Sequence, residues 1–176
     1  ADLEKIFENK APGYCYTRVG NPTVTAFENR ITKLEGGMAS IACASGMAAI
    51  MNAILNIVRS GDEMVSSASL YGGSIDLFRD IEEFGIKTRY VKNNDWEAIE
   101  GAINEHTRLL FAETIGNPCL DVTDVERLAE IAHAHKIPLI LDNTTATAYL
   151  FQGLKHGADI VVNSSSKYIN GSSNSI

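Results

Sequence analysis

Short apolar runs alternate with amphipathic stretches along most of the chain. The runs are typical of strands buried on both faces, and they predict strands at residues 63–66, 86–91, 108–113, 138–141 and 159–162. Between them, apolar residues recur at the spacing of one helix face, which predicts helices at residues 74–84, 95–105 and 124–135 and a short helix near 149–155. This alternation predicts an α/β fold of three layers, in which helices cover both faces of a mostly parallel sheet.

Two further helices are predicted before the alternating part, and the residues that precede them show no clear periodicity. Pro22 opens the first helix, with Asn21 as its cap and a glycine pair at its end. Ser45 caps the second, whose inner face carries Ile50, Met51, Ile54, Leu55 and Val58. The uncharged stretch 36–58 is long enough to span a membrane, but polar residues and a turn interrupt it, which favours a buried helix.

Composition and charge narrow the class of protein. The 176 residues suffice for one domain with a sizeable core, and a net charge of −7 argues against a nucleic-acid surface. The three cysteines lie far apart and form no metal-binding pair, which favours a reducing, cytoplasmic setting without disulfides or zinc. His133 and His135 lie two residues apart on a predicted helix and are interpreted as surface histidines. We therefore expect a cytoplasmic protein without a metal, a membrane span or a nucleic-acid partner.

Polar residues follow three of the predicted strands at the points where the strands end. Glu113, Asp142 and Ser164 take these places, and a helix begins at Gly46. Because the carboxyl ends of parallel strands share one edge of a sheet, these groups are expected to face one crevice. The amides at a helix start suit a phosphate, and a glycine there lets the backbone approach a ligand closely.

Lys167 follows the last predicted strand and lies 25 residues after Asp142. An amine that forms a Schiff base and a carboxylate that pairs with a pyridinium nitrogen are what a protein needs to hold pyridoxal phosphate. Each residue also has an ordinary interpretation, with Lys167 as a surface lysine, Asp142 as a turn residue and Ser45 as a simple helix cap. Glu113 followed by Asn117 is likewise an ordinary end of a strand. Only the ordered combination favours the cofactor.

Six motifs in a fixed order carry a resemblance to a known family. They are Tyr16-Thr-Arg-Val-Gly-Asn-Pro-Thr23, Ser45-Gly-Met-Ala-Ala49, Leu70-Tyr-Gly-Gly-Ser74, Glu113-Thr-Ile-Gly-Asn-Pro118, Asp142-Asn-Thr144 and Ser164-Ser-Ser-Lys-Tyr168. With them the chain resembles the large domain of the Cys/Met-metabolism family of pyridoxal-phosphate enzymes, and within it the O-acetylhomoserine sulfhydrylases most closely. The resemblance implies the aspartate aminotransferase-like fold, fold type I.

This resemblance also implies a role for each matching residue. Lys167 would hold the cofactor as a Schiff base and then move protons at the substrate, while Tyr71 would stack on the ring and assist proton transfer. Asp142 would keep the ring nitrogen protonated, and Glu113 would shape the substrate side. The other cofactor contacts would come from the amides of Gly46 and Met47, the hydroxyls of Ser164 and Ser166, the side chain of Asn117 and the supporting Thr144.

Tyr16 and Arg18 would reach the phosphate of a neighbouring subunit, since arginine recognises phosphate well. The resemblance therefore implies at least a dimer and, as in the family, a tetramer built as a dimer of dimers. It divides the chain into residues 1–22, a segment that serves a neighbouring site, and residues 23–176, a cofactor-binding large domain without the family's small C-terminal domain.

The reaction implied is γ-replacement on an activated homoserine. Sulfide would displace the acyl group, acetate in the most similar relatives, to give homocysteine in methionine biosynthesis. Elimination, as in methionine or cystathionine γ-lyases, and the cystathionine γ-synthase reaction use the same residues and remain alternatives. A non-catalytic fragment is a further alternative if the chain ends at residue 176.

Overall fold

The structure is a computed structural model that describes residues 3–8 and 10–175. The chain divides into two compact units, one up to Ala42 and one from Cys43 onward. Each unit is built around different elements.

The first unit contains two helices, α1 (Leu3–Phe7) and α2 (Pro22–Glu35). As predicted, the Asn21 side chain caps α2 by accepting hydrogen bonds from the backbone N–H groups of the first turn, and Gly36 ends the helix in the left-handed conformation (φ 70°). Helix α1 was not predicted, because its five residues are too few to show a periodicity. Apolar side chains of α2 are not buried, since Phe27 and Leu34 are 40% and 46% exposed.

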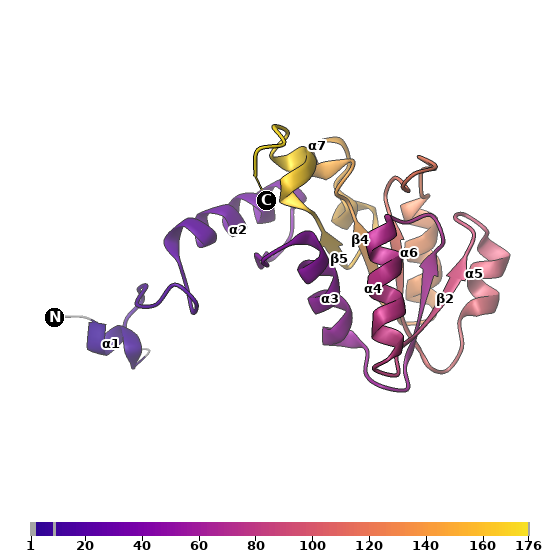
Figure 1. Ribbon diagram of the computed structural model, residues 1–176, viewed down its shortest axis with the longest axis horizontal. Helices are drawn as coiled ribbons and strands as arrows, with labels where there is room; N and C mark the ends of the chain where they lie inside the picture. The colour runs from indigo at the N-terminus through magenta and orange to yellow at the C-terminus, as the bar shows by residue number, and fades with distance from the viewer. Residues whose placement is uncertain (1–2, 9, 176) are drawn as a thin grey trace. The chain divides into compact units, whose positions relative to one another are not determined.

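The second unit is a parallel sheet with helices on both faces, which confirms the predicted fold class (Figure 1). Five strands lie in the order β2-β1-β3-β4-β5, and every neighbouring pair is parallel. The strands are β1 (Glu63–Ser67), β2 (Lys87–Val91), β3 (Thr107–Glu113), β4 (Leu139–Asp142) and β5 (Ile160–Val162). The helices are α3 (Gly46–Ile57), α4 (Gly72–Glu82), α5 (Trp96–Ala102), α6 (Val125–Ala134) and α7 (Thr147–Leu150), followed by a 3₁₀ turn (Gly153–His156) and a π-helical turn (Ser165–Ile169).

Two apolar layers hold the helices on the sheet, and β3 contributes alternate side chains to each. Leu109 and Phe111 join the layer under α3 and α4, whereas Leu110 and Ala112 join the layer under α5 and α6. Phe78 on α4 meets Phe111 edge to face, with ring centroids 5.0 Å apart. Each large side chain buried in this way stabilises the fold by roughly 1.5–3 kcal/mol. The sheet is therefore a rigid base for the groups at its strand ends.

Two predicted helices differ from the structure. Helix α5 ends at Ala102, three residues earlier than predicted. The helix predicted near 149–155 is two separate pieces, α7 and the 3₁₀ turn. The physical reason is tertiary: the Asn143 side chain donates to the Phe151 carbonyl oxygen (2.7 Å), and Gly153 packs so closely that a Cβ there would lie 2.7 Å from Leu141.

None of the helices in the described part of the chain is long and apolar enough to cross a membrane. The uncharged stretch 36–58 contains a loop and the whole of α3, and Ile50 and Ile54 on the inner face of this helix are almost fully buried. Among the same residues, no group of three or more His, Cys, Asp or Glu side chains could hold a metal ion. Cys15, Cys43 and Cys119 are free thiols.

Candidate cofactor site

Strands β3, β4 and β5 bring the predicted carboxylates to one edge of the sheet. Glu113 and Asp142 are the last residues of their strands and lie opposite each other in the parallel register. Asp142 in turn lies opposite Val162, at the end of β5. The chain after each of these strands therefore leaves the sheet on the same side, as the sequence predicted for ligand-binding groups.

Thr144 connects Asp142 to the segment that follows β5. The Thr144 backbone N–H donates to Asp142 Oδ1 at 2.9 Å, and the Ser164 N–H donates to Thr144 Oγ1 at 2.8 Å. Burial raises the pKa of Asp142 above its ordinary value, and the hydrogen bonds from Thr144 offset this only in part. No cation among the described side chains forms an ion pair with Asp142. The site thus holds a half-buried carboxyl group that a cationic ligand would stabilise in its ionised form.

The start of α3 lies directly against Ser164. A Cβ built on Gly46 would lie 2.8 Å from Ser164 Cβ and 3.2 Å from Ser164 Oγ. Ser45 caps the helix by accepting from the Ala48 N–H at 3.1 Å, as predicted. The N–H groups of Gly46 and Met47 have no acceptor within the part of the chain that the structure describes. Two free amides at the positive end of a helix and an adjacent hydroxyl form a cradle suited to a phosphate.

Replacing Gly46 by alanine is expected to weaken binding of a phosphate-bearing cofactor by roughly tenfold or more, since the new methyl group must displace Ser164 from the cradle. Titration of the cofactor-free protein with pyridoxal phosphate measures this change. Gly101→Ala is the matched control, because Gly101 is also helical and a Cβ there meets no atom within 4 Å. Equal affinity of the Gly46→Ala variant and the wild type would contradict the assignment of the cradle.

Glu113 fixes the position of Tyr71. Its side chain is only 6% exposed, and Oε1 accepts a hydrogen bond from the Tyr71 backbone N–H at 2.7 Å. Tyr71 stands at the start of α4, and its ring is half exposed and covers Gly73. Burial raises the pKa of Glu113 to about 7, the negative charges of Asp142 and Asp121 add to this, and the Tyr71 amide opposes it. Glu113 is therefore a carboxyl group that changes charge near neutral pH.

Lys167 lies in the π-helical turn after β5, where its backbone departs from helical geometry (φ −93°, ψ −117°). The turn is joined to the cradle, because the Lys167 N–H donates to the Ser164 carbonyl oxygen at 3.2 Å. Its side chain is exposed, and its amine has no ion-pair or hydrogen-bond partner among the described residues. Ser166, in the same turn, is half-buried. The amine is thus available to a ligand at this edge.

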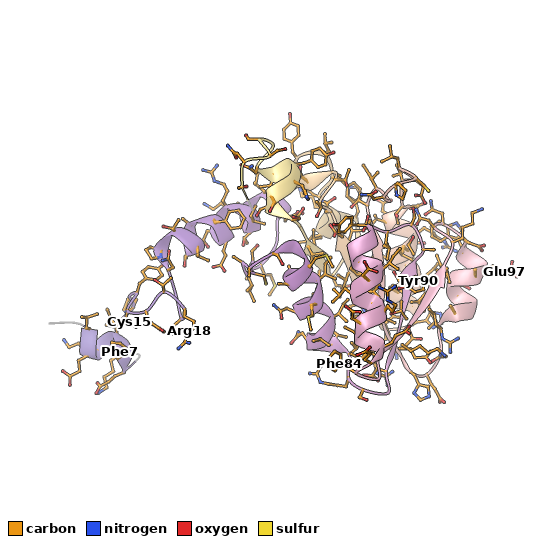
Figure 2. The ribbon with its side chains drawn as sticks, viewed as in Figure 1. Phe7, Cys15, Arg18, Phe84, Tyr90 and Glu97 are labelled. Carbon is orange, nitrogen blue, oxygen red and sulfur yellow. The ribbon has the colours of Figure 1, made fainter. Side chains whose placement is uncertain are left out.

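The other predicted site residues lie on loops. Asn117 is exposed on the loop after β3 and precedes Pro118 through a cis peptide bond. Tyr16 and Arg18 lie in the first unit, on the loop between α1 and α2, where Figure 2 labels Arg18. The Arg18 guanidinium carbon lies 5.1 Å from the centre of the Tyr16 ring. Such cation–π contact holds the two side chains together. Their predicted role in a neighbouring subunit's site stays a prediction.

Sequence reasoning missed Asn143, which is fully buried next to Asp142. Asn143 Oδ1 accepts from Thr114 Oγ1 at 2.7 Å, and its N–H donates to the Val162 carbonyl oxygen at 2.9 Å. These bonds tie the ends of β3, β4 and β5 together and hold the backbone on which Asp142 stands. The signal in the sequence is weak, because an Asp-Asn pair after a strand is also an ordinary turn.

The residues present fit pyridoxal phosphate on three independent grounds. The cradle of α3 and Ser164 suits its phosphate, the half-buried Asp142 suits its pyridinium nitrogen, and the amine of Lys167 suits its aldehyde. A parallel sheet with this site at the ends of its strands defines the class: the cofactor-binding large domain of a fold type I pyridoxal-phosphate enzyme. Comparison with known families is more specific. Residues 1–176 match the model of the Cys/Met metabolism PLP-dependent enzymes, and the chain belongs to this family.

Relatives of known name narrow the comparison. The chain is 44% identical over 173 residues to O-acetyl-L-homoserine sulfhydrylase of Leptospira meyeri, covering 98% of this chain and 39% of that protein. It is 41% identical over 167 residues to L-methionine gamma-lyase of Fusobacterium nucleatum subsp. nucleatum, covering 94% of this chain and 42% of that protein. The chain therefore spans less than half the length of these relatives.

A solved structure supports the fold. The chain superimposes on a protein described as an O-acetylhomoserine (thiol)-lyase from Campylobacter jejuni with a TM-score of 0.91 and 36% identity, covering 99% of this chain and 43% of that one. In that structure a lysine is present as N'-pyridoxyl-lysine-5'-monophosphate.

Proposed function

We propose that the protein of which this chain forms the cofactor-binding part catalyses γ-replacement on O-acetylhomoserine. The sulfur of sulfide takes the place of the acetate group on the γ carbon, and the products are homocysteine and acetate. The observation that carries the cofactor part of this proposal is the contact of the α3 start with Ser164 at the strand end next to Asp142. Similarity to O-acetyl-L-homoserine sulfhydrylase supports the choice of reaction.

In this proposal the residues at the strand ends divide the work of binding the cofactor. The backbone N–H groups of Gly46 and Met47 donate hydrogen bonds to the phosphate. The hydroxyl groups of Ser164 and Ser166 donate further hydrogen bonds to it. Asp142, held by Thr144, keeps its negative charge against the pyridinium nitrogen. When bound, pyridoxal phosphate supplies an electron sink that stabilises negative charge on the substrate carbon next to the amino group.

Lys167 carries the chemistry that the chain itself performs. Its amine binds the cofactor covalently, and once the substrate amine replaces it, the freed amine moves protons at the α and β carbons. Tyr71 stacks on the cofactor ring and assists these transfers, and Asn117 binds the ring's phenolic oxygen. Glu113 lies on the substrate side and shapes it. Amine exposure at Lys167 and the fixed position of Tyr71 support these roles.

The proposal includes a site shared between subunits, in a dimer or a dimer of dimers, with Tyr16 and Arg18 of one subunit at the phosphate of the next. A mixing experiment tests the sharing. Lys167→Ala and Arg18→Ala subunits, each impaired alone, are expected to recover about a quarter of wild-type activity when refolded together in equal amounts, because half of the dimers are hybrids and each hybrid has one intact site. The control is a mixture of either single variant with the Lys167→Ala/Arg18→Ala double variant, in which no hybrid has an intact site. If the two single variants together recover no more activity than this control mixture, the sharing is contradicted.

Elimination is the second candidate reaction, because the similarity to L-methionine gamma-lyase is nearly as high as that to the sulfhydrylase. Steady-state assays of the full-length protein separate the two. O-acetylhomoserine and O-succinylhomoserine are each supplied with sulfide, and methionine is supplied alone. Homocysteine as the main product from the acetyl ester supports the proposal, whereas 2-oxobutanoate from methionine as the main product overturns it in favour of a lyase.

We place the protein in the cytoplasm, where its free thiols suit a reducing setting.

A further inference from the structure

Asp121 connects two loops that carry cofactor-contacting residues in the proposed function. The Ser69 hydroxyl, on the loop between β1 and α4, donates a hydrogen bond to Asp121 Oδ1, on the loop between β3 and α6. Ser69 precedes Tyr71 by two residues, and Asp121 follows Asn117 by four. The bond joins segments 52 residues apart in the sequence. It therefore ties the base of the Tyr71 loop to the base of the Asn117 turn.

The turn that carries Asn117 is closed on Asp121. The Gly116 N–H donates to the Asp121 carbonyl oxygen and the Leu120 N–H donates to the Gly116 carbonyl oxygen, each at 2.9 Å. Packing here leaves no room, because a Cβ on Gly116 would collide with Ser69 Oγ and lie 2.6 Å from Asp121 Oδ1. Asp121 thus contacts both the start of the turn, through its backbone, and Ser69, through its side chain.

The carboxylate of Asp121 is ionised at neutral pH. Burial acts to raise its pKa, but the Ser69 hydroxyl and the nearby Asn93 amide together lower the pKa below its ordinary value. A hydrogen bond to a charged group is stronger than one between neutral groups. The Ser69 bond is therefore a strong link between the two loops, in addition to the bond from Tyr71 to Glu113.

We propose that Asp121 is a positioning residue whose bond to Ser69 sets the spacing between Tyr71 and Asn117 on the cofactor ring. The Tyr71 backbone is fixed by its hydrogen bond to Glu113. The turn that carries Asn117 is fixed to the Tyr71 loop by the bond between Asp121 and Ser69. Removing the Asp121 bond lets the turn move relative to the Tyr71 loop, so the ring loses one of its two fixed contacts. This inference deepens the proposed function and rests on it.

A double-variant cycle in the full-length protein tests the link. Ser69→Ala and Asp121→Ala are each expected to weaken pyridoxal phosphate binding to the cofactor-free protein by roughly tenfold, since each removes the same charge-assisted hydrogen bond. The double variant is expected to lose no more than the larger single loss. Asp121→Asn retains an oxygen acceptor for the Ser69 hydroxyl and is expected to retain most of the affinity.

Asp124→Ala is the matched control. Asp124 lies in the same loop and caps α6 through the Arg127 N–H at 3.1 Å, so its loss lowers the melting temperature without changing cofactor affinity. Losses of affinity that follow the melting temperature across all variants, or that add up in the double variant, would overturn the positioning role. Unchanged affinity in both single variants would also overturn it while the proposed function stands. A wild-type protein that does not bind pyridoxal phosphate would overturn the proposed function and this inference together.

Discussion

Replacing Lys167 by alanine is expected to abolish turnover by the full-length protein. The amine is exposed at the strand ends, and it has no ion-pair or hydrogen-bond partner among the described side chains. Loss of a positioned base for proton transfer alone lowers a rate by roughly 10²–10⁴-fold. Loss of the covalent link to the cofactor adds to this effect. Activity is therefore expected to fall below detection in a homocysteine-forming assay.

Chemical trapping gives an independent measurement for the same variant. Borohydride reduction of the cofactor-loaded wild type, followed by peptide mapping, is expected to place the pyridoxyl group on Lys167. Lys155→Ala is the matched control, since Lys155 is an exposed lysine on the 3₁₀ turn before β5. It should keep both the label and the activity. A label that persists in Lys167→Ala would show that another amine holds the cofactor.

Replacing Asp142 by asparagine is expected to lower kcat/KM by roughly 10²–10³-fold, the scale found when one preorganised electrostatic group is removed from an active site. The side chain keeps its shape and its acceptor for the Thr144 N–H, but it loses the negative charge that would hold the pyridinium nitrogen protonated. The electron sink is then weaker. Asp76→Asn, at an exposed residue that pairs with Arg79 on α4, is the matched control and should retain full activity.

Asp142→Asn lowers activity, but it is expected not to lower the stability of the cofactor-free protein. Burial raises the folded-state pKa of Asp142 above its unfolded value, so the folded state binds its proton more tightly and loses stability as pH rises through this range. At pH 7 the charge therefore destabilises the cofactor-free fold, and asparagine relieves this cost. Urea unfolding at pH 7 should give an Asp142→Asn protein at least as stable as the wild type. A clear loss of stability would mean that Asp142 has a structural partner instead.

Much of the second unit could be predicted from the sequence because its strands are continuous apolar runs. The run at 108–113 corresponds to β3 within one residue, and the predicted cap at Ser45 is present, as is the cap at Asn21 in the first unit. Predictions failed where a contact from a distant residue decides the local structure. The Asn143 side chain binds the Phe151 carbonyl oxygen, and the predicted helix at residues 149–155 is divided there, with Gly153 as the one local signal of a break.

The same distinction applies to the site. Glu113 and Asp142 were predictable, because any residue that ends a parallel strand lies at the ligand edge. The Ser69–Asp121 bond was not, because a serine and an aspartate 52 residues apart have no pattern that links them. Gly46 falls between these cases: the sequence indicated a close approach of the backbone, and the structure identifies Ser164 as the neighbour that requires it.

The turn after β5 has a consequence for how the protein exchanges its cofactor. It carries both Ser164 and Lys167, which are joined by the hydrogen bond from the Lys167 N–H to the Ser164 carbonyl oxygen. A local opening of this turn would carry both groups away from α3 together. A ligand that bridges α3 and Ser164 opposes this opening, and at a hundred times its dissociation constant it adds about 2.7 kcal/mol to the closed state. Amide hydrogen exchange in the turn and release of the cofactor would then report the same opening event.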